Sequence, residues 1–322
     1  MTSVDHLIQN LKAGDRRALA QVITLVESTL PADRITADVI LTKIVPRRTN
    51  TITIGISGAP GVGKSTFIDA FGTLAAKKYP RLAVLAVDPT SPVSGGSILG
   101  DKTRMETLTT ITSVFIRPSP SGEGQGGVGR RTRESILLCE SAGFDFTIVE
   151  TVGVGQAEIS VASMVDVLIV LQGPNAGDEL QGIKRGVLEV ADMIVITKAD
   201  GDALMAAERA KREHDNAMHL TRSNREWMPP VILTSAVSGE GLNKVLVDIE
   251  RFVDHQKISG EFSARRKSQT IQWFDQEFTY ALRDWFFADT ERRSRHDKMR
   301  QQSANEAVPA SVAARTIFTD LI

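Results

Sequence analysis

The spacing of apolar residues changes twice along the chain, and the two changes divide it into three parts. Residues 4–46 carry apolar side chains at helical spacing, interrupted near Gly14 and Pro31, which predicts three short helices. From about residue 50, short apolar runs alternate with helical stretches, and after about residue 256 only charged helical sequence remains. We therefore expect an N-terminal helical segment, an α/β domain and a C-terminal helical arm, at residues 1–47, 48–256 and 257–322.

The apolar runs of the middle part are candidate strands. Most are continuous Val/Ile/Leu stretches, which is typical of strands buried on both faces of a parallel sheet. Because helical stretches separate them, we predict an α/β fold with a mostly parallel central sheet. The predicted strands are 51–57, 82–87, 113–117, 145–149, 166–171, 192–196 and 231–234.

A glycine-rich segment lies between the first predicted strand and a predicted helix. It runs from Gly58 to Ser65 and matches G-x-x-x-x-G-K-[ST], the P-loop pattern. Glycines allow several backbone N–H groups to point inward, at the positive end of the following helix, where they bind phosphate. In this pattern Lys64 contacts the β- and γ-phosphates, and the Ser65 hydroxyl is a ligand of Mg²⁺. The residues predicted to bind the nucleotide here are Gly58, Ala59, Pro60, Gly61, Val62, Gly63, Lys64, Ser65 and Thr66.

Acidic residues after two of the strands are candidates for magnesium binding and hydrolysis. Asp88 follows the second predicted strand, and Asp101 lies further along the same connection. Glu150 follows the fourth strand and begins an acid-x-x-Gly element, in which the Gly153 N–H approaches the γ-phosphate and senses its loss. Mg²⁺ prefers hard oxygen ligands, so the predicted magnesium ligands are Ser65, Asp88, Asp101 and Glu150. The predicted catalytic residues are Lys64, Asp101 and Glu150.

These acidic residues also have structural interpretations. Asp88 precedes Pro89, and aspartate before proline commonly forms a turn. The element at Glu150 has the composition of an ordinary strand-to-helix turn. The neighbouring P-loop favours the catalytic interpretation in both cases.

Two further loops predict which base is bound. Asp200 ends a Thr-Lys-Ala-Asp sequence after the sixth predicted strand, and a carboxylate there accepts hydrogen bonds from guanine N1–H and its 2-amino group. Adenine would leave that carboxylate unpaired. Thr197 stands where this motif usually has Asn, so one contact near the base or the P-loop is weakened or rebuilt. We predict GTP, with base contacts from Lys198, Asp200, Ser235, Ala236 and Val237.

Composition narrows the class of protein. The chain has 322 residues, of which 42% are hydrophobic, enough to bury a full α/β core. Its formal net charge of −1 gives no general attraction to nucleic acid or membrane, and no run of about 18 apolar residues is present. Cys139 is alone, which excludes an intrachain disulfide and a cysteine-based metal site. The first residues lack a signal-peptide pattern, so we expect a soluble cytoplasmic protein without nucleic-acid or membrane partners.

Longer motifs are similar to those of the MeaB/ArgK family, over about residues 30–290. Besides the P-loop they are Val87–Pro92, Gly95–Met105, Glu150–Gln156 and Gly177–Lys184. The resemblance implies a GTPase, related to the metallochaperone GTPases, that chaperones an adenosylcobalamin-dependent acyl-CoA mutase such as methylmalonyl-CoA mutase and gates its cofactor loading or exchange. It also implies a homodimer held by the C-terminal arm.

The resemblance assigns roles to particular residues. Asp88, Asp101 and Glu150 fall on the family's magnesium and hydrolysis positions. Residues 172–184 fall on its third switch, which relays the nucleotide state to the mutase. The loop Gly122–Gly127 departs from the family pattern: an Arg is missing and Glu123 is present, which favours a flexible connector over a second phosphate site.

The C-terminal arm carries two aromatic stripes. On a helix, one narrow stripe contains Ile271, Phe274, Phe278, Leu282 and Trp285. Trp273, Tyr280 and Phe287 lie on the opposite side, so the arm needs two surfaces to pack against. The nearby basic run at 292–295 is interleaved with acidic residues and is interpreted as a solvated face rather than an RNA-binding one.

Three other functions remain as alternatives. A metallochaperone delivering a metal such as nickel would need a His-rich tract or Cys-x-x-Cys, whereas the chain has five scattered His and one Cys. An ArgK-like kinase of a transport-binding protein would need an acceptor pocket. A structural ATP-binding module is opposed by Glu150 and Asp200.

Overall fold

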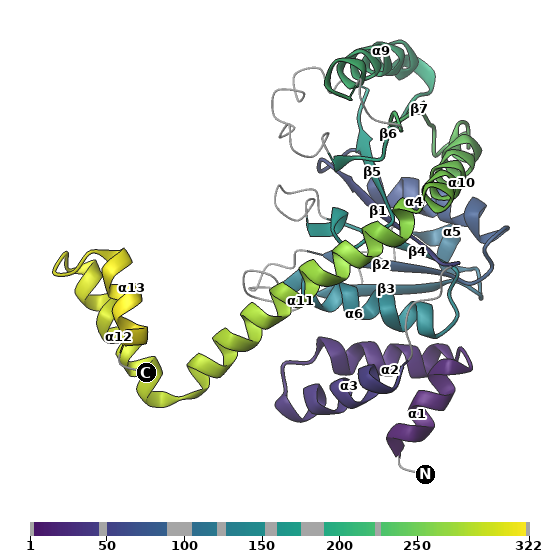
Figure 1. Cartoon of the computed structure of the whole chain (residues 1–322). Coiled ribbons are helices and arrows are strands. Elements are labelled where there is room, and N and C mark those ends of the chain that lie inside the picture. Colours follow the sequence, from purple (N-terminus) through teal and green to yellow (C-terminus); the bar gives the residue numbers. More distant parts are fainter. Residues whose placement is uncertain are drawn as a thin grey trace. The chain divides into compact units, whose positions relative to one another are not determined.

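The computed structural model of the protein describes residues 3–44, 50–88, 105–120, 127–151, 160–174, 190–222 and 227–319. It confirms the predicted α/β fold, with a parallel sheet flanked by helices (Figure 1). The helices are α1 (Ser3–Lys12), α2 (Arg16–Glu27), α3 (Pro31–Lys43), α4 (Lys64–Ala76), α5 (Glu106–Thr109), α6 (Gly127–Ser141), α9 (Leu204–Arg222), α10 (Leu242–Ser259), α11 (Glu261–Ala288), α12 (Thr290–Ala304) and α13 (Ala310–Thr319). The strands are β1 (Ile52–Gly58), β2 (Leu82–Asp88), β3 (Phe115–Pro120), β4 (Phe146–Glu150), β5 (Val167–Gln172), β6 (Met193–Ile196) and β7 (Val231–Leu233).

The sheet has seven described strands in the order β3-β2-β4-β1-β5-β6-β7, and all neighbouring pairs are parallel. β1 lies at its centre, with Ile56 beside Glu150 of β4 and Gly58 beside Leu171 of β5. Strands β1, β4, β5 and β6 are buried along their whole length, as their continuous apolar runs predict. β3 ends in Arg-Pro-Ser-Pro, which an edge strand tolerates because its outer N–H groups need no partner strand.

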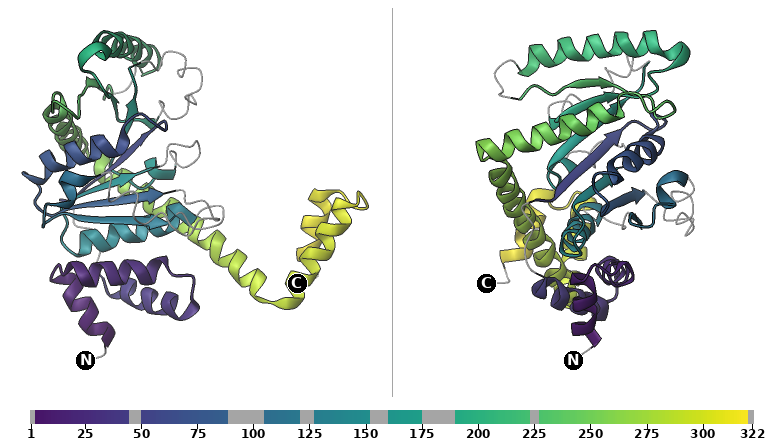
Figure 2. Two further views of the ribbon diagram at one scale, coloured as in Figure 1. Left: turned by 180° about the vertical axis from the view of Figure 1, so that it is seen from behind. Right: turned by 90° about the vertical axis from the view of Figure 1, so that its right-hand side faces the viewer.

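Helices cover both faces of the sheet, which gives three layers (Figure 2). On one face, Phe67 and Phe71 of α4 stack with ring centroids 5.4 Å apart and share a core cluster with Phe252 of α10. On the other face, α6 packs beside β2 and α9 packs on β6 and β7. Burying each such large side chain stabilises the fold by about 1.5–3 kcal/mol.

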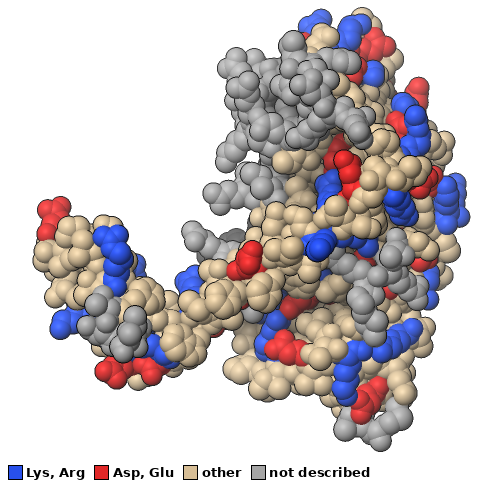
Figure 3. Space-filling view, in the orientation of Figure 1, with Lys and Arg blue, Asp and Glu red and all other residues tan. Residues whose placement is uncertain are grey.

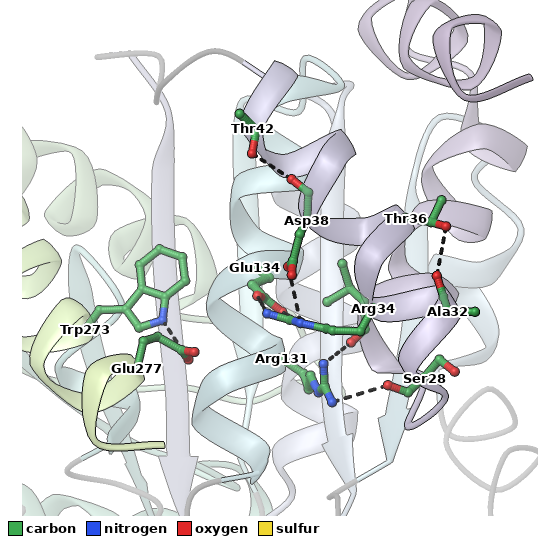
Figure 4. A network of polar contacts seen from close by, with 11 residues as sticks. Ser28, Ala32, Arg34, Thr36, Asp38, Thr42, Arg131, Glu134, Trp273 and Glu277 are labelled. Atoms are coloured by element: carbon green, nitrogen blue, oxygen red, sulfur yellow. Dashed lines mark hydrogen bonds and ion pairs between the residues drawn. The ribbon is translucent and has the colours of Figure 1, made fainter. Parts of the chain in front are cut away.

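The N-terminal helices pack on α6 and β3. The apolar stripe of α2 is fully buried in the same cluster as α6 side chains. Polar contacts fix the same junction: the Arg34 guanidinium of α3 donates to both carboxylate oxygens of Glu134 in α6, at 2.9 and 2.6 Å (Figure 4). Arg131 of α6 donates to the carbonyl oxygens of Val26 and Ser28. These contacts attach the segment before the P-loop to the helix that follows β3.

Two arginines attach the start of α11 to the sheet, at the edge where the strands begin. Arg265 donates to both oxygens of Asp192, at 3.1 and 2.9 Å, and Arg266 to both oxygens of Asp166, at 2.7 and 2.6 Å. Asp166 also accepts from the backbone N–H of Thr53 in β1. Burial by itself lowers the pKa of Arg266, but hydrogen bonds and the charge of Asp166 outweigh it and raise the pKa above its ordinary value.

The described chain divides into two compact units, residues 1–266 and 267–322. In the second unit, α12 and α13 pack together, and Phe286, Ala313 and Ile317 are buried. Phe286 contacts Phe318, with ring centroids 5.8 Å apart. Within the described residues, none of the helices combines the length and the apolar character that crossing a bilayer requires. The segment boundaries at 47/48 and 256/257 stay predictions.

Candidate nucleotide-binding site

The P-loop connects β1, which ends at Gly58, to α4, which begins at Lys64. Gly63 caps α4 with a left-handed backbone, φ +96°, a conformation that side chains other than glycine rarely adopt. At Gly58 a Cβ atom would lie 2.6 Å from the carbonyl oxygen of Leu171, so the neighbouring strand leaves no room for a side chain. The backbone therefore turns at the end of the central strand, and the first N–H groups of α4 point into the loop.

Two side chains at the start of α4 extend into this loop region. Lys64 Nζ donates to the carbonyl oxygens of Gly58 and Ala59, at 2.7 and 3.1 Å. The Ser65 hydroxyl donates to Glu150 Oε1 at 3.1 Å, and Glu150 is 8% exposed. The predicted P-loop and the acid after β4 are therefore in direct contact, although 85 residues separate them.

The order of the strands explains why these residues meet. From β1 the chain moves to β2 and β3 on one side, and after β4 it crosses to β5, β6 and β7 on the other. In open α/β sheets, ligands bind outside the carboxyl ends of the strands at such a reversal. The P-loop, Glu150 and the loops after β6 and β7 all lie at that edge.

The two loops predicted to bind the base contact each other. The Ser235 hydroxyl donates to the Asp200 carboxylate, and the backbone N–H of Ser238 donates to the same hydroxyl at 3.1 Å. The Ser235 N–H itself donates to the carbonyl of Glu240. Ala236 is half-buried and Val237 is 90% exposed. Ser235 thus acts in this arrangement through its hydroxyl, which holds the Asp200 carboxylate in place.

Thr197, which stands where the motif usually has Asn, contacts the P-loop through its hydroxyl. It is buried, and its hydroxyl donates to the Val62 carbonyl in the P-loop at 2.7 Å and lies 3.1 Å from the Gln172 carbonyl at the end of β5. Next to it, Lys198 has a left-handed backbone, φ 55°, and its Nζ donates to the Gly61 carbonyl at 2.9 Å. Two side chains of the loop after β6 therefore donate hydrogen bonds to backbone carbonyls of the P-loop.

The chain is similar to known GTPases over most of its length. Residues 19–291 match the family described as methylmalonyl-CoA mutase-associated GTPase MeaB. The chain belongs to the MeaB family of P-loop GTPases. Among its relatives, GTPase ArgK of Escherichia coli is 45% identical over 283 residues, which cover 88% of this chain and 86% of that protein. The mitochondrial methylmalonic aciduria type A homolog of Mus musculus is 47% identical over 281 residues, 84% of this chain and 68% of that protein.

A solved structure supports the fold of this MeaB-family GTPase over its whole length. The crystal structure of an LAO/AO transport system kinase matches with a TM-score of 0.78 and 34% identity, covering 100% of this chain and 99% of that one. As a member of this GTPase family, the chain hydrolyses GTP and binds guanine nucleotide.

The donor set of the site fits that nucleotide with Mg²⁺. The Ser65 hydroxyl and the Glu150 carboxylate lie side by side, and both are the hard oxygen ligands that Mg²⁺ prefers. The Asp200 carboxylate, which the sequence predicts to contact the guanine edge, is oriented by the Ser235 hydroxyl. Among the described residues, no group of three or more His, Cys, Asp or Glu side chains lies close enough together to hold a metal ion.

Several predicted residues cannot be placed in the site. Asp101, Gly153 and the loop 122–126 lie outside the described residues, as do positions 175–184 of the predicted relay. Asp88 is the last residue of β2, and its side chain is also outside the description. The roles of all the site residues remain predictions.

Sequence reasoning missed two hydroxyl contacts. Thr197 contacts Val62, 135 residues away, and Ser235 contacts Asp200, 35 residues away. No local sequence pattern predicts these hydrogen bonds. The strand order is what brings them together.

Proposed function

We propose that this GTPase chaperones an adenosylcobalamin-dependent acyl-CoA mutase and gates the loading or exchange of its cofactor. The observation that supports this most directly is the match of residues 19–291 to the family of methylmalonyl-CoA mutase-associated GTPases. Hydrogen bonds link the P-loop to Glu150 and to the loop after β6, and that loop to the one after β7. This supports the proposal, because a gatekeeper needs a conformation that depends on the bound nucleotide.

Different residues of the site would bind the phosphates, the guanine base and Mg²⁺. The P-loop N–H groups and Lys64 bind and orient the phosphates, and Asp200, held by Ser235, selects guanine. Mg²⁺, when bound, neutralises charge that develops on the phosphates. Ser65, Asp88, Asp101 and Glu150 would hold it, and Glu150 would also orient the attacking water.

The described residues also suggest how the site reaches the predicted relay at 172–184. Its first residue, Gln172, ends β5, and its carbonyl accepts a hydrogen bond from the Thr197 N–H at 2.8 Å. The base loop, the P-loop and the beginning of the relay thus share Thr197. A change of nucleotide that displaces the P-loop would act on Gln172 through Thr197, which contacts both.

The assay compares GTP hydrolysis by the purified chain with and without purified methylmalonyl-CoA mutase. We expect stimulation by the mutase, and loss of that stimulation in Lys184→Ala while intrinsic hydrolysis stays near the parent rate. Lys77→Ala, an exposed lysine at the end of α4, is the matched control and should respond normally. A chain that neither binds nor responds to such a mutase would refute the chaperone role.

The same assay separates the kinase alternative. With GTP labelled at the γ-phosphate, the proposed function releases the label as inorganic phosphate. Transfer of the label to another protein would instead support a kinase of the kind named for the LAO/AO transport system structure.

A further inference from the structure

The Thr197 side chain has one hydrogen to donate, and backbone carbonyls of the chain accept it. Its buried hydroxyl lies 2.7 Å from the Val62 carbonyl oxygen and 3.1 Å from that of Gln172. A hydroxyl has a single O–H donor, so no donor of this side chain is left for a nucleotide, whichever carbonyl accepts it. An asparagine at this position would carry two amide N–H donors, one for the Val62 carbonyl and one for the base.

The neighbouring donors of the loop after β6 are also paired within the protein. The backbone N–H of Thr197 donates to the carbonyl at the end of β5 at 2.8 Å, and that of Ala199 donates to a carbonyl after β7 at 3.0 Å. Lys198 Nζ donates to the Gly61 carbonyl of the P-loop at 2.9 Å. Both side-chain donors of this stretch, and two of its N–H groups, therefore already have acceptors.

The loop after β7 keeps two N–H groups that a base can use. The N–H groups of Ser235, Ser238 and Gly239 donate within this loop, at 3.0, 3.1 and 2.9 Å. Among the described residues, none accepts a hydrogen bond from the N–H of Ala236 or Val237. A carbonyl oxygen has two lone pairs, so these two N–H groups match the O6 atom of guanine.

Guanine carries one more acceptor than these donors satisfy. Its edges present the N1–H and 2-amino donors and the O6 and N7 acceptors. The Asp200 carboxylate, oriented by the Ser235 hydroxyl, matches the two donors. The N–H groups of Ala236 and Val237 match O6, so N7 is the acceptor that is left over.

We propose that this chain recognises guanine without a hydrogen bond to N7, because the only side-chain donor of Thr197 is used by backbone carbonyls. This mode of recognition depends on the predicted contact between Asp200 and guanine. The nucleotides that the site accepts are therefore those with the N1–H, 2-amino and O6 pattern, whether or not position 7 carries an acceptor. Thr197 is the residue that determines this specificity.

GDP and 7-deaza-GDP, in which a C–H group replaces N7, test this recognition without hydrolysis. In calorimetric titrations of the full chain with Mg²⁺, we expect the two Kd values to agree within about twofold. Inosine diphosphate lacks the 2-amino group that Asp200 is predicted to read, and it should bind at least about tenfold more weakly than GDP. Binding of GDP that is about fivefold or more tighter than that of 7-deaza-GDP would overturn the proposal, since another donor would then read N7. Equal binding of GDP and inosine diphosphate would overturn it as well, because the Asp200 contact would be missing.

Thr197→Asn should create the contact that the parent lacks. Its amide can donate to the Val62 carbonyl and to N7 together, so this variant should bind GDP about fivefold more tightly than 7-deaza-GDP, the effect of one neutral hydrogen bond. Thr197→Ser keeps the hydroxyl and should show the equal binding of the parent. An asparagine variant that binds GDP but does not distinguish the two nucleotides would refute the role of residue 197. If that variant does not fold, the comparison on the parent chain still decides whether N7 is read. Stimulation by the mutase is measured with GTP and does not depend on N7, so the chaperone role and this proposal can fail separately.

Discussion

Glu150 is the residue in which structural contact and predicted chemistry coincide. Its carboxylate accepts from Ser65 at the start of α4, in a nearly buried position at the end of β4. Glu150→Gln keeps the shape and the hydrogen-bond acceptor but removes the charge. We expect GTP to bind with nearly unchanged affinity while hydrolysis falls at least about tenfold. Lys64→Ala, in contrast, should weaken both binding and turnover, and a Gln variant with the parent rate would exclude a catalytic role for Glu150.

The hydroxyl of Thr197 lies within hydrogen-bond distance of two backbone carbonyls. Thr197→Val preserves the shape of the side chain and removes that hydroxyl, so the Val62 carbonyl loses its donor in a buried position. We expect the Kd for both GDP and GTP to rise about tenfold, because a lost partner for a buried polar group costs about 1–3 kcal/mol. Thr197→Ser keeps the hydroxyl and should bind like the parent. Calorimetric titration of the three proteins measures the difference; equal affinities would mean that the P-loop does not depend on this contact.

Among the helices, α9 contains a titratable group inside an apolar layer. His214 is fully buried, and neither ring nitrogen has a hydrogen-bond partner among the described residues. Burial lowers its pKa, and Glu213 and Asp215 offset only part of that effect. Below about pH 6.5 the unfolded chain therefore takes up a proton at this residue that the folded chain does not, so the free energy of unfolding falls as the pH falls.

Removing this group should flatten the pH dependence of stability. In urea unfolding between about pH 7 and pH 5, His214→Leu should lose less stability than the parent. His6→Leu changes an exposed histidine on α1 and should follow the parent curve. If the two variants show the same dependence, protonation of His214 does not contribute.

The elements also show what a sequence can and cannot predict. Continuous apolar runs such as β5 indicate strands because burial on both faces requires apolar side chains throughout, and all seven predicted strands are present with small shifts at their ends. The P-loop was predictable because its phosphate chemistry is encoded in eight adjacent residues. The attachment of α11 was not. Arg265 and Arg266 look like part of a charged helix, and only the sheet order reveals that Asp192 and Asp166 lie beneath them.

At the scale of the whole molecule, α11 is one continuous helix that belongs to both compact units. Its first turns carry the arginines that bind the sheet edge, and its later turns carry the narrow stripe from Ile271 to Trp285. Figure 3 shows mainly uncharged residues over this part of the helix on the side that faces the viewer. Assembly and folding should therefore depend on different parts of the same helix, and truncations at two points separate them.

A chain that ends at Thr270 keeps Arg265 and Arg266 but lacks the stripe. We expect it to be monomeric by light scattering and to bind GTP. Its free energy of unfolding in denaturant should be close to that of residues 1–266 in the full chain. A chain that ends at Ala264 keeps the buried Phe262 but loses both arginines, and it leaves Asp166 without its guanidinium partner in a buried position. Its free energy of unfolding should be lower by at least about 3 kcal/mol, because removing one partner of a buried ion pair exposes the other to an uncompensated desolvation penalty. Equal stability of the two truncated chains would mean that the arginines do not stabilise the domain. If the longer truncated chain is a dimer, residues before 271 make the dimer contact.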